Sequence, residues 1–534
     1  RMIEPSPKLL VMEAIAASRS AVRLSSPPDG VLEVAFAAMI YLFLMPVLTT
    51  GCLHKSQSFP PALRSGKPWP SDMGQFDFDV AVIGGGSAGY ATARTVTAAG
   101  KRTAVIEGGQ ALGGLCILRG CMPTKALLHA ADVRFQAKRS GIWGLEPGEI
   151  GFDFRKVMQR RADMVEEFAS YRRGQLQDGR FELIRGLAKF RDPHTLEVDN
   201  GRAITAGQFM ISTGSRVADL PLAALAKLGC MTSDDALELK SLPKSIIVLG
   251  GGAVALEFAQ FFARFDVEVT VLQRSANVLR DFDDDAGTEV EAAFRDEGIA
   301  VHTGCTLTDA RAEGADKVIV YEQARKTCEL RAEAVFHGLG RSPNTASLAL
   351  GNAGVETERG RIISNAQMQT SASHIFAGGD CTGPHEIVHL AVQQGEVAGH
   401  NMLHADSPQS MDYRLLTSVV FTDPQAAVVG LTEKAAKEQG IPYLTASYPF
   451  NDHGKSIIME AMHGFVKLLC DPKSGEILGG ACVGPMGGEL IHEIVAAMAK
   501  RMTVGELAVM PHYHPTLAEI WTYPADDLAE EVAG

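Results

Sequence analysis

Two short apolar runs, each followed at once by glycines, stand out in the pattern of hydrophobic and polar positions along the chain. One run covers residues 79–83 and the other covers residues 245–249. Apolar runs of this length that end in glycine predict buried strands. After each run the pattern predicts a helix and then a second strand, over residues 90–99 and 102–106 in the first case and 255–265 and 267–272 in the second. Strands that alternate with helices predict parallel sheets with crossover helices.

Both glycine runs have the spacing of a dinucleotide-binding turn. In that turn the first small residue allows a tight bend, the second lets the backbone approach a pyrophosphate, and the third lets the helix pack closely on the strand. The small residues of the two runs are Gly84, Gly86 and Gly89, and then Gly250, Gly252 and Ala255. Two such turns predict two bound nucleotides.

The residue that ends the second strand differs between the two units. Glu107 ends the first, 18 positions after Gly89, where an acid can bind a ribose hydroxyl. Gln273 stands at the matching place in the second unit, followed by Arg274 and, further on, Arg280. Arginine there can accept a 2'-phosphate, which favours NADPH, with NADH as the alternative. The other interpretation is that Glu107 and both arginines merely face solvent.

A pair of cysteines separated by four residues lies between the two units. Pro123 follows Cys121 closely, and the amphipathic run 125–138 predicts a helix that begins near the pair. The amides and the positive dipole end of a helix start favour a thiolate, so Cys116 and Cys121 are candidates for a redox disulfide. The alternatives are two buried cysteines or half of a zinc site. No second pair with metal-ligand spacing occurs in the chain, so we expect no metal centre.

Composition narrows the class of protein. A chain of 534 residues with 46% hydrophobic and 21% charged residues has material for about three or four globular domains. The formal net charge of -13, without a basic stripe, argues against nucleic-acid binding. The nine cysteines are odd in number and scattered, which is typical of a reducing compartment, and we expect a cytoplasmic location.

The first 72 residues have a different character from the rest. They contain an apolar run over 34–48 that is followed by Cys52, and Met73 stands just before the first predicted strand. Three interpretations are open: a membrane anchor, a signal segment that ends in a lipoprotein-like cysteine, or an extension upstream of the true start. Membrane attachment is expected only if residues 31–52 are retained in the mature protein.

At this point the chain resembles the pyridine nucleotide-disulfide oxidoreductases, dimeric FAD enzymes that include dihydrolipoamide dehydrogenase, glutathione reductase and mercuric reductase. The resemblance runs from about Phe78 to Glu519. The segments that carry it, besides the two glycine runs, are residues 113–125, 211–215, 337–344, 375–380 and 512–519. The chain departs from the family pattern at Leu115, where Thr is common, and at Ser212, where Ala is usual.

The resemblance implies an α/β architecture with two Rossmann-like dinucleotide-binding domains, for FAD and NAD(P), and a C-terminal α+β dimerisation domain. Alternating apolar positions over 418–424 and 464–485, which predict antiparallel strands, agree with the last part. The predicted segments are an N-terminal extension at 1–72, the FAD-binding domain at 73–220 and 346–411, the NAD(P)-binding domain at 221–345, and the interface domain at 412–534. A homodimer is implied.

The resemblance also implies roles for individual residues. Cys121 would face the flavin, and Cys116 would exchange with a small thiol or disulfide substrate. His514 with Glu519 would be the acid/base pair and would act on the cysteines of the other subunit, whereas His512 suits this role less well. Glu257 would pair with Lys125 near the reactive edge of the flavin. The implied cofactor-binding residues outside the glycine runs are Glu107, Lys125, Thr213, Gly214, Glu257, Arg274, Arg280, Gly340 and Asp380.

The family leaves several substrates open. The leading expectations are a dihydrolipoamide dehydrogenase-like enzyme, which the ending of the chain fits, and an NADPH-dependent disulfide reductase, which Gln273 and Arg274 fit. A glutathione reductase-like enzyme is an alternative. A mercuric reductase-like enzyme is another, although no cysteine follows Cys482, where the mercury enzymes carry a vicinal pair. A membrane-tethered flavoprotein subunit or redox sensor without turnover is the non-enzymatic alternative.

Overall fold

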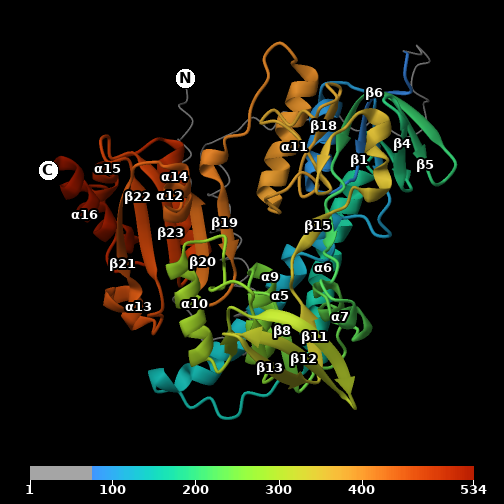
Figure 1. Ribbon diagram of the computed structural model, residues 1–534. Coiled ribbons are helices and arrows are strands. Elements are labelled where there is room, and N and C mark those ends of the chain that lie inside the picture. The colour runs from blue at the N-terminus through green and yellow to red at the C-terminus, as the bar shows by residue number, and fades with distance from the viewer. Residues whose placement is uncertain (1–74) are drawn as a thin grey trace, which may run out of the picture. The chain divides into compact units, whose positions relative to one another are not determined.

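The computed structural model describes residues 75–534, which form an α/β structure (Figure 1). The apolar run that suggested a membrane or signal segment lies outside the described residues. Within residues 75–534 no helix is both long and apolar enough to cross a membrane.

The first sheet is parallel at its centre and holds the first nucleotide turn. Its parallel strands, in spatial order, are β3 (Glu182–Arg185), β2 (Thr103–Glu107), β1 (Phe78–Ile83), β6 (Ala203–Ile211) and β18 (Ile375–Ala377). Strands β5 (Thr195–Val198) and β4 (Ala188–Asp192) continue from β6 in antiparallel fashion. Because β18 comes from much later in the chain than β6, this sheet combines segments that lie before and after the second unit in the sequence.

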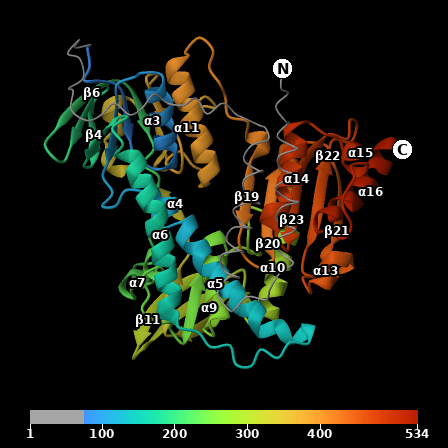
Figure 2. The same cartoon turned by 180° about the vertical axis from the view of Figure 1, so that it is seen from behind.

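Helices α3 (Ser87–Ala98) and α11 (Val388–Leu403) pack together beside this sheet (Figure 2). The Thr92 hydroxyl of α3 donates a 2.8 Å hydrogen bond to the Gly395 carbonyl of α11. The contact joins two segments of the first sheet's domain that are about 300 residues apart.

The second sheet repeats the parallel arrangement. Its strands, in spatial order, are β10 (Ala300–His302), β9 (Glu268–Leu272), β8 (Ser245–Leu249) and β14 (Ala334–His337). Helix α9 (Ala253–Arg264) follows β8, and an antiparallel sheet of β11 (Thr306–Glu313), β12 (Asp316–Gln323) and β13 (Lys326–Ala332) is inserted before β14. The chain leaves the first sheet through β7 (Ser215–Val217) and returns through β15 (Arg341–Pro343), which pair with each other.

The C-terminal part is a five-stranded antiparallel sheet, as the alternating pattern predicted. The strands, in spatial order, are β19 (Thr417–Val420), β20 (Gln425–Gly430), β23 (Ile477–Gly484), β22 (Phe465–Cys470) and β21 (Leu444–Pro449). Helices α14 (Gly487–Ala499) and α16 (Thr522–Ala533) pack against strands of this sheet. Trp521, which is fully buried, belongs to the core that they share.

The nucleotide-turn helices begin two or three residues earlier than predicted. Helix α3 begins at Ser87 with Gly86 as its N-cap, and α9 begins at Ala253 with Gly252 as its N-cap. Apolar periodicity reports only the part of a helix that faces a core. The first residues of these two helices border a cavity, so the hydrophobic pattern could not mark them.

A buried arginine joins the three parts of the structure. The guanidinium of Arg264 on α9 pairs with Asp132 at 2.5 Å, Glu297 at 2.6 Å and Asp423 at 2.8 Å. Asp132 belongs to α5 (Cys121–Arg139), which is visible from behind in Figure 2, and Asp423 follows β19. A buried charge needs partners of opposite charge, so this cluster joins α5, α9 and the segment that leads into the second strand of the C-terminal sheet.

Candidate active site

One cavity of about 1780 Å³ contains both nucleotide turns and the cysteine pair. Its lining runs from the turn after β1, past α4 (Gly114–Leu118) and the start of α5, to the turn after β8. A pocket for one drug-sized ligand is typically about 300–1,000 Å³. This cavity is large enough for two nucleotide cofactors with the thiols beside them.

The first nucleotide turn has the shape that a pyrophosphate requires. Gly84 adopts a φ of +100°, and a Cβ there would lie 2.4 Å from the Ser212 carbonyl oxygen. Gly86 has no other atom within 4 Å of its Cβ position, so its backbone is open to the cavity. A Cβ on Gly89 would lie only 1.9 Å from the Gly84 carbonyl oxygen. The three glycines therefore match the three roles predicted for them, and the turn fits the phosphates of FAD.

The second turn repeats this geometry with one exchange. Gly250 has a φ of +112°, and its Cβ would lie 2.4 Å from the Gly338 carbonyl oxygen. Gly252 is open, like Gly86. The third position is Ala255, whose side chain fits because Gly338 opposite lacks one: a Cβ on Gly338 would lie 2.7 Å from the Ala255 Cβ.

The strand-end residues behave differently in the two units. The Glu107 carboxylate accepts hydrogen bonds from the Gly85 amide at 2.8 Å and the Gly109 amide at 2.7 Å, at the edge of the cavity. Gln273 is buried, and its side-chain oxygen accepts the Arg274 amide at 3.1 Å. The first unit presents a carboxylate to the cavity, and the second presents a neutral amide.

The two predicted arginines lie beside Gln273 on the cavity wall. Arg274 is exposed and makes no ion pair with any residue from 75 to 534. Arg280 is also exposed, and its Nε lies 3.4 Å from Asp281 Oδ1. Arg274 is thus the arginine whose charge is available to a ligand.

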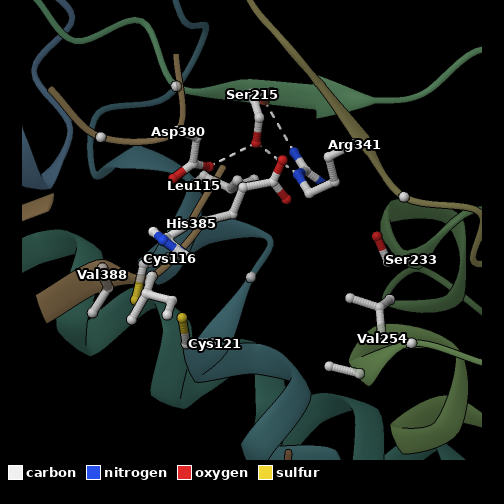
Figure 3. A pocket seen from close by; sticks show the side chains of 18 of the residues that line it. Leu115, Cys116, Cys121, Ser215, Ser233, Val254, Arg341, Asp380, His385 and Val388 are labelled. Carbon is white, nitrogen blue, oxygen red and sulfur yellow. Dashed lines mark hydrogen bonds between the residues drawn. The ribbon is translucent and has the colours of Figure 1, made fainter. Parts of the chain in front are cut away.

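Asp380 follows β18 and lines the cavity beside the first turn. Its carboxylate accepts a 2.6 Å hydrogen bond from Ser215 Oγ, which in turn accepts one of 2.7 Å from Arg341 Nε (Figure 3). Thr213, Gly214 and Gly340 line the cavity nearby, and the two glycines have positive φ angles of +69° and +102°. Sequence reasoning recognised these segments but did not assign the network to Ser215 and Arg341.

The two cysteines lie at one side of the cavity with their sulfur atoms next to each other (Figure 3). Cys116 belongs to α4, and Cys121 is the first residue of α5, as the helix-start prediction required. Gly120 lies between the helices, where a Cβ would be 3.0 Å from the Leu115 carbonyl oxygen. The missing side chain lets the two helices approach closely enough for the thiols to share a hydrogen bond.

This shared hydrogen bond separates the two thiols in acidity. Donation from Cys116 lowers the pKa of Cys121 to about 7, and the positive charge of Lys125 contributes in the same direction. The same hydrogen bond, together with burial, raises the pKa of Cys116. When the reduced pair loses its first proton, the thiolate therefore forms on Cys121.

Lys125 and Glu257 form the predicted ion pair on the cavity wall. Lys125 Nζ lies 2.7 Å from Glu257 Oε2 and 2.9 Å from Oε1, and Glu257 is buried. Sequence reasoning missed Phe421, whose amide donates to Glu257 at 3.0 Å and whose ring centroid lies 4.6 Å from Lys125 Nζ. The interface domain therefore completes a charge pair that belongs to the two nucleotide domains.

His514 and Glu519 are in contact, as the pairing implied by the family resemblance requires. His514 Nδ1 lies 2.9 Å from Glu519 Oε2, and the His514 side chain is 80% exposed. The second histidine of the motif, His512, is bound to Glu493 at 2.6 Å. Neither histidine is among the residues that line the cysteine cavity of the described chain.

The comparisons with known proteins agree with this geometry. Residues 78–395 match the family model described as pyridine nucleotide-disulphide oxidoreductase, and residues 416–525 match the dimerisation domain of the same family. The chain belongs to the pyridine nucleotide-disulphide oxidoreductase family. It is an FAD-dependent oxidoreductase that uses a nicotinamide nucleotide and a redox-active disulfide, and its dimerisation domain supports a homodimer.

Several relatives of this oxidoreductase are similar over most of their length. It is 33% identical to the dihydrolipoyl dehydrogenase of Geobacillus stearothermophilus over 82% of this chain and 93% of that protein. It is 32% identical to the mercuric reductase of Bacillus cereus over 84% of this chain and 71% of the relative. Among solved structures, the HOCl-induced flavoprotein disulfide reductase of Escherichia coli matches with a TM-score of 0.75 at 27% identity, covering 84% and 99% of the two chains.

Proposed function

We propose that this oxidoreductase prefers NADPH and reduces a small disulfide through Cys116. The observation that carries the proposal is the second strand end, where the neutral Gln273 replaces an acid and Arg274 is exposed without an ion pair in the described residues. A carboxylate at this place would repel a 2'-phosphate, and a free guanidinium would attract it. Arg280, held by Asp281, is the second cation near this site.

The proposed FAD site comprises the first glycine turn, Glu107 and Asp380. When bound there, FAD would carry electron pairs between the nicotinamide and the disulfide. Glu107 would receive a ribose hydroxyl and Asp380 the ribitol chain. The Lys125–Glu257 pair would fix charge beside the site of hydride transfer.

The pKa order of the thiols supports separate roles for them. Cys121 holds the thiolate, which suits the thiol that faces the flavin. Cys116 must lose its proton before it can attack a disulfide, because only a thiolate is nucleophilic. Since the pKa of Cys116 is raised, a base has to take that proton.

His514 is the base that we assign, supplied by the other subunit. Its exposed ring and its bond to Glu519 suit a proton carrier that is held in one tautomer. His514 takes the Cys116 proton, Cys116 attacks the substrate disulfide to form a mixed disulfide, and the released thiolate takes the proton from His514. The Cys121 thiolate then attacks Cys116 and expels the second substrate thiol, which is protonated from solvent. Two cysteines are oxidised to one disulfide, and one substrate disulfide is reduced to two thiols.

A second candidate is dihydrolipoamide oxidation with NAD, which runs the same exchange in reverse. The observation in its favour is the relative from Geobacillus stearothermophilus, a dihydrolipoyl dehydrogenase that aligns over 93% of its length. In this case the Cys116–Cys121 disulfide would accept electrons from a dithiol, and His514 would take up the protons.

Steady-state assays with both nicotinamide nucleotides test these proposals. The substrates are lipoamide, glutathione disulfide and a small aromatic disulfide in the reductive direction, and dihydrolipoamide in the oxidative direction. Faster turnover of a disulfide with NADPH is expected. Faster oxidation of dihydrolipoamide with NAD would favour the second candidate, and no turnover despite a reducible flavin would refute both.

Cys116→Ser tests the thiol assignment. The flavin of this variant should still be reduced by NADPH, whereas disulfide reduction should disappear because the exchanging sulfur is gone. The rates of the two half-reactions are measured by stopped-flow absorbance. Continued turnover of the disulfide in the Cys116→Ser enzyme would show that another group carries the exchange.

We also place the enzyme in a reducing compartment, as in the cytoplasm. Apart from the redox pair Cys116 and Cys121, the cysteines in the described part of the chain form no disulfide, which supports this location. Fractionation of cells, with mass spectrometry of the purified N-terminus, tests it and decides whether residues 31–52 are present.

A further inference from the structure

A second histidine contacts the carboxylate that holds His514. His453 lies between a 3-10 turn, η6 (Phe450–Asp452), and the short helix α13 (Gly454–Ile458), and it is completely buried. Its Nε2 lies 3.4 Å from Glu519 Oε1. On the other side of the ring, Nδ1 lies 2.8 Å from Ser456 Oγ. Ser456 is also completely buried, so bulk water does not compete for its contact with His453 Nδ1.

The neighbours of His453 decide where its proton lies. Burial lowers the pKa of His453, so the ring is neutral and carries one N–H. A carboxylate is only an acceptor, whereas a serine hydroxyl can donate. With the proton on Nε2, the ring donates toward Glu519 and accepts from Ser456. The opposite tautomer would set a nitrogen lone pair against the carboxylate. Nε2 is buried and has no hydrogen-bond partner of ordinary geometry among residues 75–534, so Glu519 Oε1, 3.4 Å away, is the acceptor that it faces.

The two oxygens of Glu519 therefore face two different imidazoles. The Oε2 atom is 2.9 Å from His514 Nδ1, and the Oε1 atom is 3.4 Å from His453 Nε2. The terminal torsion of a glutamate is broad, so one exposed partner does not fix the plane of its carboxylate. A buried donor facing the other oxygen would fix that plane, and the carboxylate would then orient the ring of His514.

We propose that His453 is a positioning residue of the acid/base dyad, and that it donates from Nε2 to Glu519 so that His514 presents its own Nε2 to the substrate sulfur. The inference rests on the proposed role of His514. Ser456 belongs to the same chain of contacts, because its hydroxyl can donate to Nδ1 when the proton is on Nε2.

The surroundings of His453 keep its own ring neutral. The groups that face it are Glu519, His514, the backbone of Thr516, the Phe450 ring and the Tyr523 ring, the two aromatic rings edge-on with centroids 6.4 Å from the imidazole. Glu519 and the Thr516 backbone favour a charged His453, but burial and His514 oppose it, and burial is the largest effect. Proton exchange with substrate is therefore left to His514.

Two variants of His453, whose side-chain amides extend to different distances, distinguish a positioning role of this residue from a role in packing. In His453→Gln the side-chain amide can reach the place of Nε2 and donate to Glu519, whereas in His453→Asn it reaches only the place of Nδ1. We expect disulfide reduction to fall about tenfold in His453→Asn and by no more than about twofold in His453→Gln, because catalytic geometry is lost only in the former. Reduction of the flavin by NADPH should be unchanged in both.

The pH profile gives a readout that packing alone would not move. Without a donor from residue 453, Glu519 holds more negative charge for the His514 imidazolium, so the pH midpoint of disulfide turnover should move to higher pH in His453→Asn and return in His453→Gln. Ser456→Ala is the variant with the smallest change in volume, and it should slow the disulfide half-reaction by about threefold. Equal rates and equal midpoints in the Asn and Gln enzymes would overturn the inference.

His514→Gln in the same assays distinguishes this inference from the proposed function. If disulfide turnover survives in His514→Gln, then the acid/base assignment itself fails. If turnover is lost in His514→Gln but persists in His453→Asn with an unchanged pH midpoint, then only the role of His453 fails. His512→Gln is the matched control, because His512 is bound to Glu493 rather than to Glu519.

Discussion

The two nucleotide-binding units are close copies in backbone geometry and differ at the positions that choose a ligand. The first glycine of each turn has a similar φ, +100° at Gly84 and +112° at Gly250. In both, a Cβ would lie 2.4 Å from the carbonyl oxygen that follows the neighbouring parallel strand, at Ser212 and at Gly338. The bend is thus dictated by the backbone, and the side chains around it are free to diverge.

The third small position of each turn shows how the side chains differ while the helix still packs closely on the strand. In the first unit the helix supplies Gly89 and the facing strand end supplies Ser212, whereas in the second the helix supplies Ala255 and the strand end supplies Gly338. The side chain has moved from one partner to the other. Close approach of helix and strand is therefore a property of the pair, and neither residue can be judged alone.

Among the variants that test this comparison, Gly89→Ala should have the largest effect on stability and on FAD binding. The new Cβ would lie 1.9 Å from a backbone oxygen, which cannot move away as a flexible side chain can. We expect the free energy of unfolding to fall by about 3 kcal/mol and FAD to be lost. Denaturant unfolding followed by flavin fluorescence measures both. The control is Gly86→Ala, which fills open space and should weaken FAD binding without lowering the stability of the apoprotein.

Gly338→Ala and Ala255→Gly test the exchange of side chains in the second unit. Gly338→Ala alone should cost about 2 kcal/mol, because the two methyl groups collide. Adding Ala255→Gly should recover about 1 kcal/mol, which a double-mutant cycle of unfolding free energies would report as coupling. Additive costs would mean that the two positions do not share one packing site.

Arg274→Glu sharpens the contrast in nucleotide choice. A negative charge beside a 2'-phosphate should shift the ratio of kcat/KM for NADPH over NADH by about tenfold toward NADH, equivalent to about 1.4 kcal/mol. Arg280→Glu is the matched control and should change the ratio less, because Arg280 already faces Asp281. A ratio that stays the same in Arg274→Glu would remove the assignment to NADPH.

Glu107→Gln should have the smallest effect and makes the first strand end resemble the second. One carboxylate oxygen becomes an NH₂ group. That group cannot accept a hydrogen bond, so either the Gly85 amide or the Gly109 amide loses its acceptor. We expect FAD binding to weaken by about 1 kcal/mol. The measurement is the Kd of the apoprotein for FAD, and unchanged affinity would show that Glu107 is not needed as an anion.

Local signals were enough to predict much of the fold and of the site. Glycine spacing placed both nucleotide turns, because the bend depends on residues adjacent in sequence. The pairing of His514 with Glu519 was predicted through the family resemblance, although only five positions separate the two residues. The pairing of Lys125 with Glu257 was predicted only through the family resemblance, since 132 residues separate them.

Contacts between distant segments without a motif were not predictable. The amide of Phe421 reaches Glu257 across 164 positions, and a backbone donor leaves no trace in residue type. Nothing in the sequence marks His453 as a neighbour of Glu519, because its environment is made by the folding of the whole interface domain. Ser215 and Arg341 were visible as residues, but their link to Asp380 depends on two strands that pair only in the folded chain.

The contact of Phe421 with Glu257 has a consequence for biosynthesis. Glu257 is buried, and it receives Lys125 from an early segment and the Phe421 amide from a late one. While the ribosome has not yet released Phe421, the buried carboxylate keeps Lys125 but lacks the amide hydrogen bond. A nascent chain that ends before Phe421 therefore holds this ion pair without its third member.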